Sequence, residues 1–212
     1  MEDLPVRNKE NSLEKVLAVS AKLQKLFPKA MLVGGTAAAV HARHRVSFDA
    51  DHVLGDLKNT FEEVLSHIEA EAGWKTAKIS PPVLILGNFH GVDTGIRKLI
   101  RSCPLETEII CLPNGDKLNI PTDSEILRIK GALILKRNAV RDYLDFAALG
   151  ANMSAEKFVL ALKNFDDLYP QPEGISALMQ LQIQMANPKP YDLATDLTEA
   201  LAEYKDLSEN IK

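Results

Sequence analysis

The stretch VGGTAAAVHARHRVSFDADHVL, residues 33–54, decides how the first part of the chain folds. The preceding AMLVGG predicts a short buried strand that ends in a glycine turn, since Gly tolerates tight turns. TAAAVHARH then predicts the start of a helix, and the alternating segment SFDADHVL predicts a returning strand. The stretch therefore predicts a strand, turn, helix and strand, with polar groups at the turn and on the second strand.

The two aspartates of this stretch lie two residues apart. On a strand, residues i and i+2 point to the same face with α-carbons about 6.5–7 Å apart, so Asp49 and Asp51 would present both carboxylates to one side. Mg²⁺ is a hard cation that binds carboxylate oxygens together with substrate phosphates. One or two such ions, about 3.5–4 Å apart when paired, could support phosphate transfer.

The turn before the helix has the composition of a phosphate-binding turn. Gly34 and Gly35 let the backbone approach a phosphate, the helix N-terminus favours anions, and the Thr36 hydroxyl can donate to a phosphate oxygen. No Gly-Lys-Ser/Thr follows, so this is no Walker loop, and the third glycine of a dinucleotide fingerprint is absent. Either motif alone is common in solvated turns, but the two joined by a helix are more specific.

The rest of the chain divides into two parts. Residues 12–27 and 58–72 predict amphipathic helices, and four short β-rich runs follow at 82–89, 92–100, 106–112 and 117–121. Thr122 with Glu125 forms a capping pattern, and helical segments follow to the end, including an acidic helix at 192–212. We therefore predict an α+β protein: a mixed β-sheet core flanked by helices over residues 1–121, and a helical domain over residues 122–212.

Composition narrows the class of protein. The chain has 212 residues, 46% of them hydrophobic, and a net charge of −4, which argues against a wholly basic nucleic-acid binder. Two basic segments, 97–101 and 128–141, could form an RNA-facing surface or simply be solvated edges. No apolar run approaches the about 20 residues of a membrane helix, the N-terminus lacks a signal-peptide pattern, and the two cysteines fit no C-x-x-C motif. These features predict a cytoplasmic protein with reduced thiols and no membrane association.

Histidines offer a different metal chemistry. His41 and His44 are one helical turn apart, and His52 and Asp49 follow closely. A structural zinc site prefers four Cys or His ligands at characteristic spacings, which are absent here. The sequence therefore disfavours zinc, and we expect His44 and Arg45 to pack against or orient the turn before the second strand.

At this point two motifs resemble a known family. GGTAAAVHARHRVSFDADHV is similar to the opening motif of the nucleotidyltransferase (DNA polymerase β-like) superfamily. PTDSEILRIKGALILKRNAVRDYLDFAAL, residues 121–149, resembles the second signature of AbiEii/AbiGii-type toxin nucleotidyltransferases: a lysine on a helix, an arginine, then R-D-x-x-D. Together the two motifs span roughly residues 30–149.

The resemblance implies a nucleotidyltransferase core with a helical C-terminal region. It implies Mg²⁺-dependent transfer of a nucleotide from an NTP to an acceptor, which in characterised relatives is often tRNA. Such relatives are toxins neutralised by an antitoxin protein. Carried onto this chain, the resemblance assigns roles to residues of both motifs: Gly35 and Thr36 meet the triphosphate, Asp49 and Asp51 bind metal, Lys130 contacts the triphosphate, and Asp142 or Asp145 is the acid of the second motif.

A third carboxylate on a neighbouring strand often completes such a site. Asp93, in the predicted strand VDTGIRKLI, is the best candidate for this catalytic and metal-binding role, with Glu106 and Glu108 as rivals. Lys130 lies in the mostly apolar segment EILRIKGALIL, which favours a functional role. Asp145 could instead pair with Arg141 as an i,i+4 surface ion pair.

Two other functions remain open from the sequence. One is a non-catalytic member of the fold that binds nucleotide without transferring it. The other is a nucleotidyltransferase of small molecules, such as an antibiotic-modifying enzyme, which would need acids around its acceptor. A neighbouring antitoxin gene would favour the toxin interpretation over these two.

Overall fold

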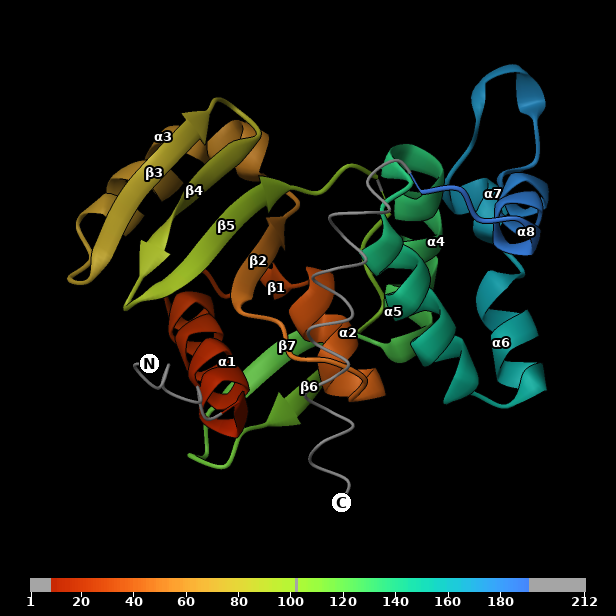
Figure 1. Cartoon of the computed structure of the whole chain (residues 1–212). Coiled ribbons are helices and arrows are strands. Elements are labelled where there is room, and N and C mark those ends of the chain that lie inside the picture. Colours follow the sequence, from red (N-terminus) through yellow and green to blue (C-terminus); the bar gives the residue numbers. More distant parts are fainter. Residues whose placement is uncertain (1–8, 102, 191–212) are drawn as a thin grey trace, which may run out of the picture. The chain divides into compact units, whose positions relative to one another are not determined.

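A computed structural model describes residues 9–101 and 103–190 of the chain (Figure 1). The chain forms two compact units, and neither is one continuous segment. Unit 1 comprises the chain up to Thr36, Val46–Ile100 and Glu108–Ile120. Unit 2 comprises Ala37–Arg45, Arg101–Thr107 and the chain from Pro121 onward.

Unit 1 is built on a mixed five-stranded sheet with the strand order β1-β2-β5-β4-β3. Strands β2 and β5 are parallel, and the other neighbouring strands are antiparallel. The strands are β1 (Met31–Leu32), β2 (Asp49–Leu54), β3 (Trp74–Ser80), β4 (Leu84–Phe89) and β5 (Val92–Lys98). The parallel pair needs a crossover, which α3 (Leu57–Glu69) and the β3–β4 hairpin provide.

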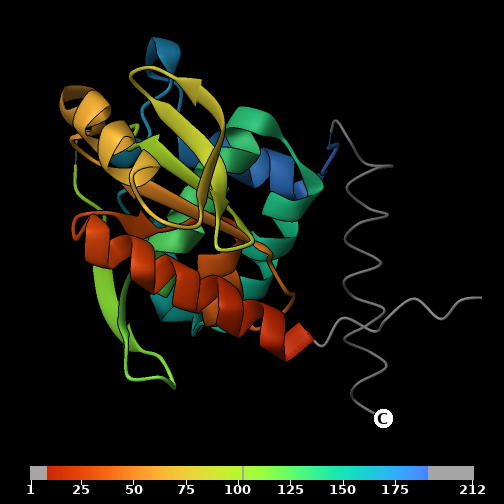
Figure 2. The same ribbon diagram turned by 90° about the vertical axis from the view of Figure 1, so that its left-hand side faces the viewer.

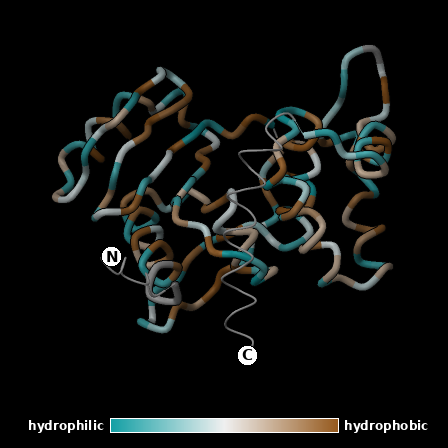
Figure 3. The backbone as a smooth tube through the Cα atoms, in the orientation of Figure 1, coloured by the Kyte–Doolittle hydropathy of each residue, from teal (hydrophilic) through white to brown (hydrophobic). Residues whose placement is uncertain are grey.

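One face of this sheet is covered by α1 (Lys9–Leu26) and α3, which lie against the strands in Figures 1 and 2. The core there is apolar: Val16, Val19, Leu23, Phe61, Val64, Ile68, Ala50, Leu54, Ile85 and Ile96. Along β2 and β4, buried residues alternate with exposed or half-buried ones, as expected for strands with only one face packed. Figure 3 colours the backbone by hydropathy, and both hydrophobic (brown) and hydrophilic (teal) residues occur along the strands of this sheet. We call the face that the two helices leave uncovered the open face.

A separate two-stranded sheet pairs β6 (Thr107–Cys111) with β7 (Lys117–Pro121). Gln24 of α1 is tied to β7 twice. Its side-chain amide donates to the Asn119 carbonyl at 2.7 Å and accepts from the Asn119 N–H at 2.7 Å. This reciprocal pair satisfies backbone groups of a strand that would otherwise lack partners.

Unit 2 is helical. After the last residues of α2 (Gly34–Ala42), it contains α4 (Asp123–Arg137), α5 (Val140–Ala151), α6 (Ala155–Leu162), α7 (Phe165–Leu168), a 3₁₀ turn (Pro172–Gly174) and α8 (Ala177–Ala186). The Thr122 side chain caps α4 by accepting from the Glu125 N–H at 3.2 Å. Gly131 lets neighbouring helices approach α4, since a β-carbon there would lie 2.9 Å from Leu181 and 3.1 Å from Phe165.

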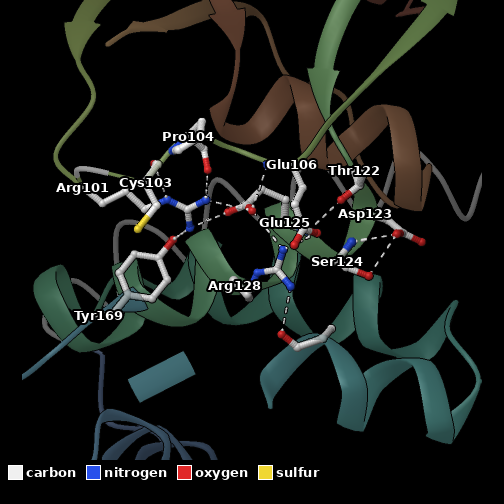
Figure 4. A network of polar contacts seen from close by, with 11 residues as sticks. Arg101, Cys103, Pro104, Glu106, Thr122, Asp123, Ser124, Glu125, Arg128 and Tyr169 are labelled. Atoms are coloured by element: carbon white, nitrogen blue, oxygen red, sulfur yellow. Dashed lines mark hydrogen bonds and ion pairs between the residues drawn. The ribbon is translucent and has the colours of Figure 1, made fainter. Parts of the chain in front are cut away.

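A buried ionic network fixes the start of α4 (Figure 4). Glu125 is fully buried, and its carboxylate pairs with Arg101 at 2.8 Å and with Arg128 at 2.9 Å. It also accepts the backbone N–H of Glu106 at 3.2 Å. Arg101 Nη1 lies 3.3 Å from the Tyr169 hydroxyl, and burial raises the pKa of Tyr169 to about 12. These contacts hold Arg101 and Glu106 against α4 and join Arg101 to Tyr169, which directly follows α7.

The prediction of an α+β protein with a mixed sheet followed by helices is confirmed. The edge strand β3 was not predicted, because only Trp74 at its start is buried and the pattern of WKTAKIS shows no alternation. The predicted acidic helix at 192–212 lies outside the described residues. In the part of the chain that the structure describes, no helix is long and apolar enough to cross a membrane.

Candidate functional site

Strands β2 and β5 bring three carboxylates together on the open face. In the parallel register, Asp49 lies opposite Asp93 and Asp51 lies opposite Gly95. Residues paired in this way share one face of the sheet on strands about 4.8 Å apart. The structure therefore places Asp93, the first choice for a third carboxylate, beside Asp49 and Asp51.

The two rival glutamates lie elsewhere. Glu106 pairs with Arg128 at 2.6 Å within unit 2. Glu108 belongs to β6 of the separate two-stranded sheet. Neither is on a strand that neighbours β2, so the register favours Asp93 as the third acid of the site.

The Asp51 carboxylate is seated between two glycines. A β-carbon at Gly95 would lie 2.5 Å from Asp51 Oδ1, closer than real atoms approach. A β-carbon at Gly34 would lie 3.5 Å from the Asp51 side chain, and Gly34 has a positive φ of 76°, which L side chains rarely adopt. Arg97, two residues after Gly95, donates to Asp51 Oδ1 at 3.3 Å. Gly95 thus makes room for this carboxylate, whereas a β-carbon at Gly34 would only be in van der Waals contact with it, and Gly34 is favoured there by its positive φ.

Asp93 is held by a neighbouring strand. Asn88, opposite Asp93 on β4, donates its amide N–H to Asp93 Oδ1 at 2.9 Å. The side-chain oxygen Oδ1 of Asn88 accepts a hydrogen bond from the Gly91 N–H at 2.9 Å, which fixes the orientation of the side-chain amide. Asn88 is therefore a positioning residue for the third carboxylate.

The glycine turn is tied directly to the carboxylate strand. The Val33 N–H donates to the Asp51 carbonyl at 2.8 Å, and the Thr36 hydroxyl donates to the Asp49 carbonyl at 2.6 Å. Gly34 and Gly35 are half-buried at the N-terminus of α2, whereas Thr36 is fully buried. The Thr36 hydroxyl, expected to face a phosphate, thus has a backbone partner in this structure and connects the turn to β2.

The three carboxylates are of the donor type that Mg²⁺ prefers. They are hard oxygen donors on one face, at positions that the register makes adjacent. Within residues 9–101 and 103–190, no three His, Cys, Asp or Glu side chains already converge as a metal-binding group. Asp51 turns toward Arg97, and Asp93 toward Asn88.

The histidines do not share a site. His52 is fully buried on the helix-covered face, Nδ1 lies 3.0 Å from the Ala50 carbonyl, and burial lowers the pKa of His52 to about 4. His41 contacts the Pro121 carbonyl at 2.7 Å, and His44 contacts Asp145 at 2.7 Å. Each of these three histidines thus has a different partner, and the three do not point to a common ligand position.

The second motif forms a buried ion-pair cluster in unit 2. The Lys130 side chain is 1% exposed, and its ammonium lies 3.2 Å from Asp142 and 2.5 Å from Asp145. Both carboxylates are fully buried. Arg137 pairs with Asp142 through two nitrogens, at 2.5 and 2.8 Å. Lys130 was expected to contact a triphosphate; in this structure its contacts are these two acids.

Asp145 has more side-chain partners than Asp142. Arg45 Nε donates to Asp145 at 2.7 Å, and His44 lies at the same distance. Burial alone would raise the pKa of the Asp145 carboxyl, but His44, Lys130 and Arg45 together hold that pKa well below its usual range. Arg141 is exposed, so the cluster, rather than an i,i+4 surface pair, accounts for Asp145.

Two residues that position the carboxylates, Gly95 and Asn88, were not predicted from the sequence. Gly95 had a signal, because a glycine inside a strand often marks close approach of another group. Asn88 had none, since its role depends on the register between β4 and β5. Arg97 was noted only as part of a basic segment, and its contact with Asp51 follows from their nearness across β2 and β5.

The fold of the chain matches that of solved nucleotidyltransferases. MenT4, the nucleotidyltransferase toxin Rv2826c from Mycobacterium tuberculosis H37Rv, superposes with a TM-score of 0.52 at 16% identity, over 81% of this chain and 73% of that one. The antibiotic-resistance factor ANT(2'')-Ia superposes with a TM-score of 0.55 at 9% identity, over 82% and 98% of the two chains. At these identities the likeness concerns the fold alone.

Sequence comparison gives a different relative. No family model matches the chain. Heme uptake protein MmpL11 from Mycobacterium tuberculosis H37Rv is 41% identical over 118 residues, which is 55% of this chain and 12% of that protein. The chain thus spans about an eighth of the length of the curated relatives it matches.

Proposed function

We propose that this chain is an Mg²⁺-dependent nucleotidyltransferase that moves a nucleotide from an NTP to an acceptor hydroxyl. One observation carries the proposal: Asp49, Asp51 and Asp93 share one face of the sheet. A glycine turn and a helix N-terminus lie beside Asp51, where a triphosphate would bind. If these carboxylates had only a structural role, there would be no reason for three adjacent acids to lie beside an anion-binding turn.

The transfer step is a displacement at phosphorus. The acceptor oxygen bonds to the α-phosphorus, the bond from that phosphorus to the pyrophosphate oxygen breaks, and pyrophosphate leaves. Asp93 accepts the hydroxyl proton, and Asn88 keeps its carboxylate oriented. The backbone N–H groups at Gly34 and Gly35 bind phosphate oxygens. When bound, Mg²⁺ supplies charge neutralisation on the phosphates and is held by the three carboxylates.

Lys130, Asp142 and Asp145 enter the proposal as a second set of site residues. They either contact the triphosphate, as the family resemblance implies, or hold the helices of unit 2 in place. Their complete burial and mutual pairing favour positioning. Lys130→Met separates these roles, because only a direct contact with the triphosphate would abolish NTP binding without lowering stability.

For the acceptor we propose tRNA or another RNA, with the protein acting as the toxin of a toxin–antitoxin pair. The resemblance of both motifs and the structural likeness to a nucleotidyltransferase toxin support this choice. The alternative is a small-molecule acceptor. It is favoured by the likeness to ANT(2'')-Ia, of which a second structure holds adenylyl-2''-tobramycin.

The test is a transfer assay with each radiolabelled NTP, Mg²⁺, and either total tRNA or tobramycin. We expect label in RNA with the parent and none with Asp49→Ala/Asp51→Ala. The matched control is Glu62→Ala/Glu63→Ala, which removes two exposed acids from α3 and should leave transfer intact. Label in tobramycin alone would support the alternative. NTP binding without transfer to any acceptor would favour a non-catalytic member of the fold.

A further inference from the structure

The open face of the sheet is organised in rows that cross strands β2, β5, β4 and β3. The strand registers place one residue of each strand in each row. The rows are Asp49–Asp93–Asn88–Lys75, Asp51–Gly95–Leu86–Lys78 and Val53–Arg97–Leu84–Ser80. Each row starts on the strand that carries the D-x-D motif and ends on the edge strand β3.

Charge changes sign along the first two of these rows, from acids to a lysine. The acids lie on β2 and β5, whereas β4 contributes no charge and β3 contributes Lys75 and Lys78. Three strand spacings separate β2 from β3, about 14 Å. Both lysines are exposed, and Arg97 lies between the two ends with a 47% exposed side chain. The open face therefore presents cations at graded distances from the carboxylates.

Most of the other basic residues considered for an RNA surface are already neutralised. Arg128, Lys130 and Arg137 of the 128–141 segment form ion pairs within unit 2. Arg101 of the 97–101 segment is paired with Glu125, as Figure 4 shows. Of the 128–141 segment, Lys136 and Arg141 remain exposed. The cations on the open face come from strands β3 and β5.

The surface of β4 and β5 that lies between these cations is apolar. Leu84 and Leu86 are half-buried on β4, and Gly95 has no side chain. A nucleic-acid strand combines apolar base faces with regularly spaced phosphates, so its bases can contact the two leucines while its phosphates contact the cations. A cationic acceptor such as an aminoglycoside would instead meet charges of its own sign on β3 and β5.

We propose that the acceptor is a single-stranded RNA segment that lies across β5, β4 and β3. Its phosphates contact Arg97, Lys78 and Lys75, and its reactive hydroxyl reaches the carboxylates. This inference rests on the proposed function and adds the surface that selects the acceptor. When the carboxylates bind metal, Arg97 breaks its contact with Asp51 and contacts an RNA phosphate instead. The same side chain thus has a partner both with and without metal.

Edge strands often carry lysines for another reason, which is to prevent pairing with other chains. In that case Lys75 and Lys78 would have no effect on acceptor binding. The decisive variant is Lys75→Glu/Lys78→Glu, with Lys75→Gln/Lys78→Gln as a milder second variant. The matched control is Lys22→Glu/Lys58→Glu, which makes the same change of charge on α1 and α3, the helices of the covered face.

Two binding measurements separate the inference from the function on which it rests. Titration of a fluorescent single-stranded RNA at several salt concentrations reports the acceptor surface, and calorimetry with Mg²⁺ and NTP reports the nucleotide site. We expect the Lys→Gln pair to lower the slope of log K against log salt by about 1.4, near 0.7 per lost phosphate contact. The Lys→Glu pair should weaken RNA binding about tenfold or more. NTP binding should stay unchanged in both.

Unchanged RNA affinity and salt slope in both lysine variants, with NTP binding intact, would overturn the inference and leave the proposed function standing. Equal weakening in the Lys22→Glu/Lys58→Glu control would overturn it too, because the effect would then be net charge. Label transferred to a protein or to tobramycin instead of RNA would also contradict it. Absence of NTP binding in the parent protein would instead contradict the proposed function.

Discussion

At the scale of single residues, the site depends on where side chains are missing as much as on where they are present. Asp51 can occupy its position because Gly95 lacks a β-carbon there. The same carboxylate accepts a hydrogen bond from Arg97. Local sequence pattern explains the aspartates, and only the pairing of β2 with β5 explains the glycine opposite Asp51.

Gly95→Ala tests this arrangement without touching a carboxylate. The new methyl group would meet Asp51 Oδ1, so the carboxylate must move, and displacement by about 1 Å can lower a transfer rate about 100-fold. Gly55→Ala is the control, because a β-carbon there meets nothing within 4 Å. Transfer rates and thermal unfolding of both variants check the prediction. Full activity of Gly95→Ala would show that the transfer rate does not depend on the position of the Asp51 carboxylate.

Lys130→Met separates a structural from a direct role for this lysine. Removal of one partner from a buried ion-pair cluster leaves Asp142 and Asp145 under-compensated, and such losses destabilise by about 3–5 kcal/mol. Urea unfolding measures the effect. Arg141→Met, on the exposed side of α5, should change stability by less than about 0.5 kcal/mol. Wild-type stability of Lys130→Met together with lost NTP binding would place Lys130 at the triphosphate instead.

Asp145 makes stability depend on acid pH. Its pKa is lowered in the folded state, relative to about 3.9 in the unfolded chain. Its stabilising contribution is therefore complete above about pH 4 and is lost as the pH falls toward the lower folded pKa. We expect the free energy of unfolding to fall more steeply between about pH 5 and pH 3 in the parent than in Asp145→Asn. Equal slopes would contradict the pKa assignment.

At the scale of elements, helix α4 organises unit 2 from its first turn. Thr122 caps it, and Glu125 joins it to residues 101–107 through Arg101 (Figure 4). Glu125→Gln keeps the shape but leaves two buried guanidinium groups under-compensated, so we expect a loss of about 3 kcal/mol. Glu156→Gln, exposed in the first turn of α6, is the control. Chemical unfolding monitored by circular dichroism gives both values, and similar values would contradict a special role for Glu125.

Elements differ in how far sequence predicts them, and the reason is where their partners lie. Strand β2 and helix α3 were predicted because each buries one face, and that periodicity is local. Strand β3 was missed because an edge strand with one buried residue has almost no periodic pattern. Lys130 in an apolar helix suggested function, but acids 12 and 15 residues further along the chain account for its burial equally well.

At the scale of the whole molecule, two units have separate cores, each described by its own cluster of buried residues. The predicted domains, 1–121 and 122–212, divide the chain once. That division stays a prediction, and the compact units include short segments from elsewhere in the chain, since Ala37–Arg45 and Arg101–Thr107 belong to the helical unit. Sequence pattern cannot reveal such segments, because His44, Arg45 and Arg101 find their partners about 24 to 101 residues away. The fold class was predictable, and the long-range pairing was not.

The measurement that tests the central claim most directly is a crystal structure with Mn²⁺ and a non-hydrolysable NTP, using the anomalous signal of the metal. The account predicts anomalous density at ligating distance from carboxylates of Asp49, Asp51 and Asp93, with the triphosphate against Gly34 and Gly35. Metal or nucleotide bound elsewhere on the protein, with these three carboxylates unliganded at saturating concentrations, would contradict it.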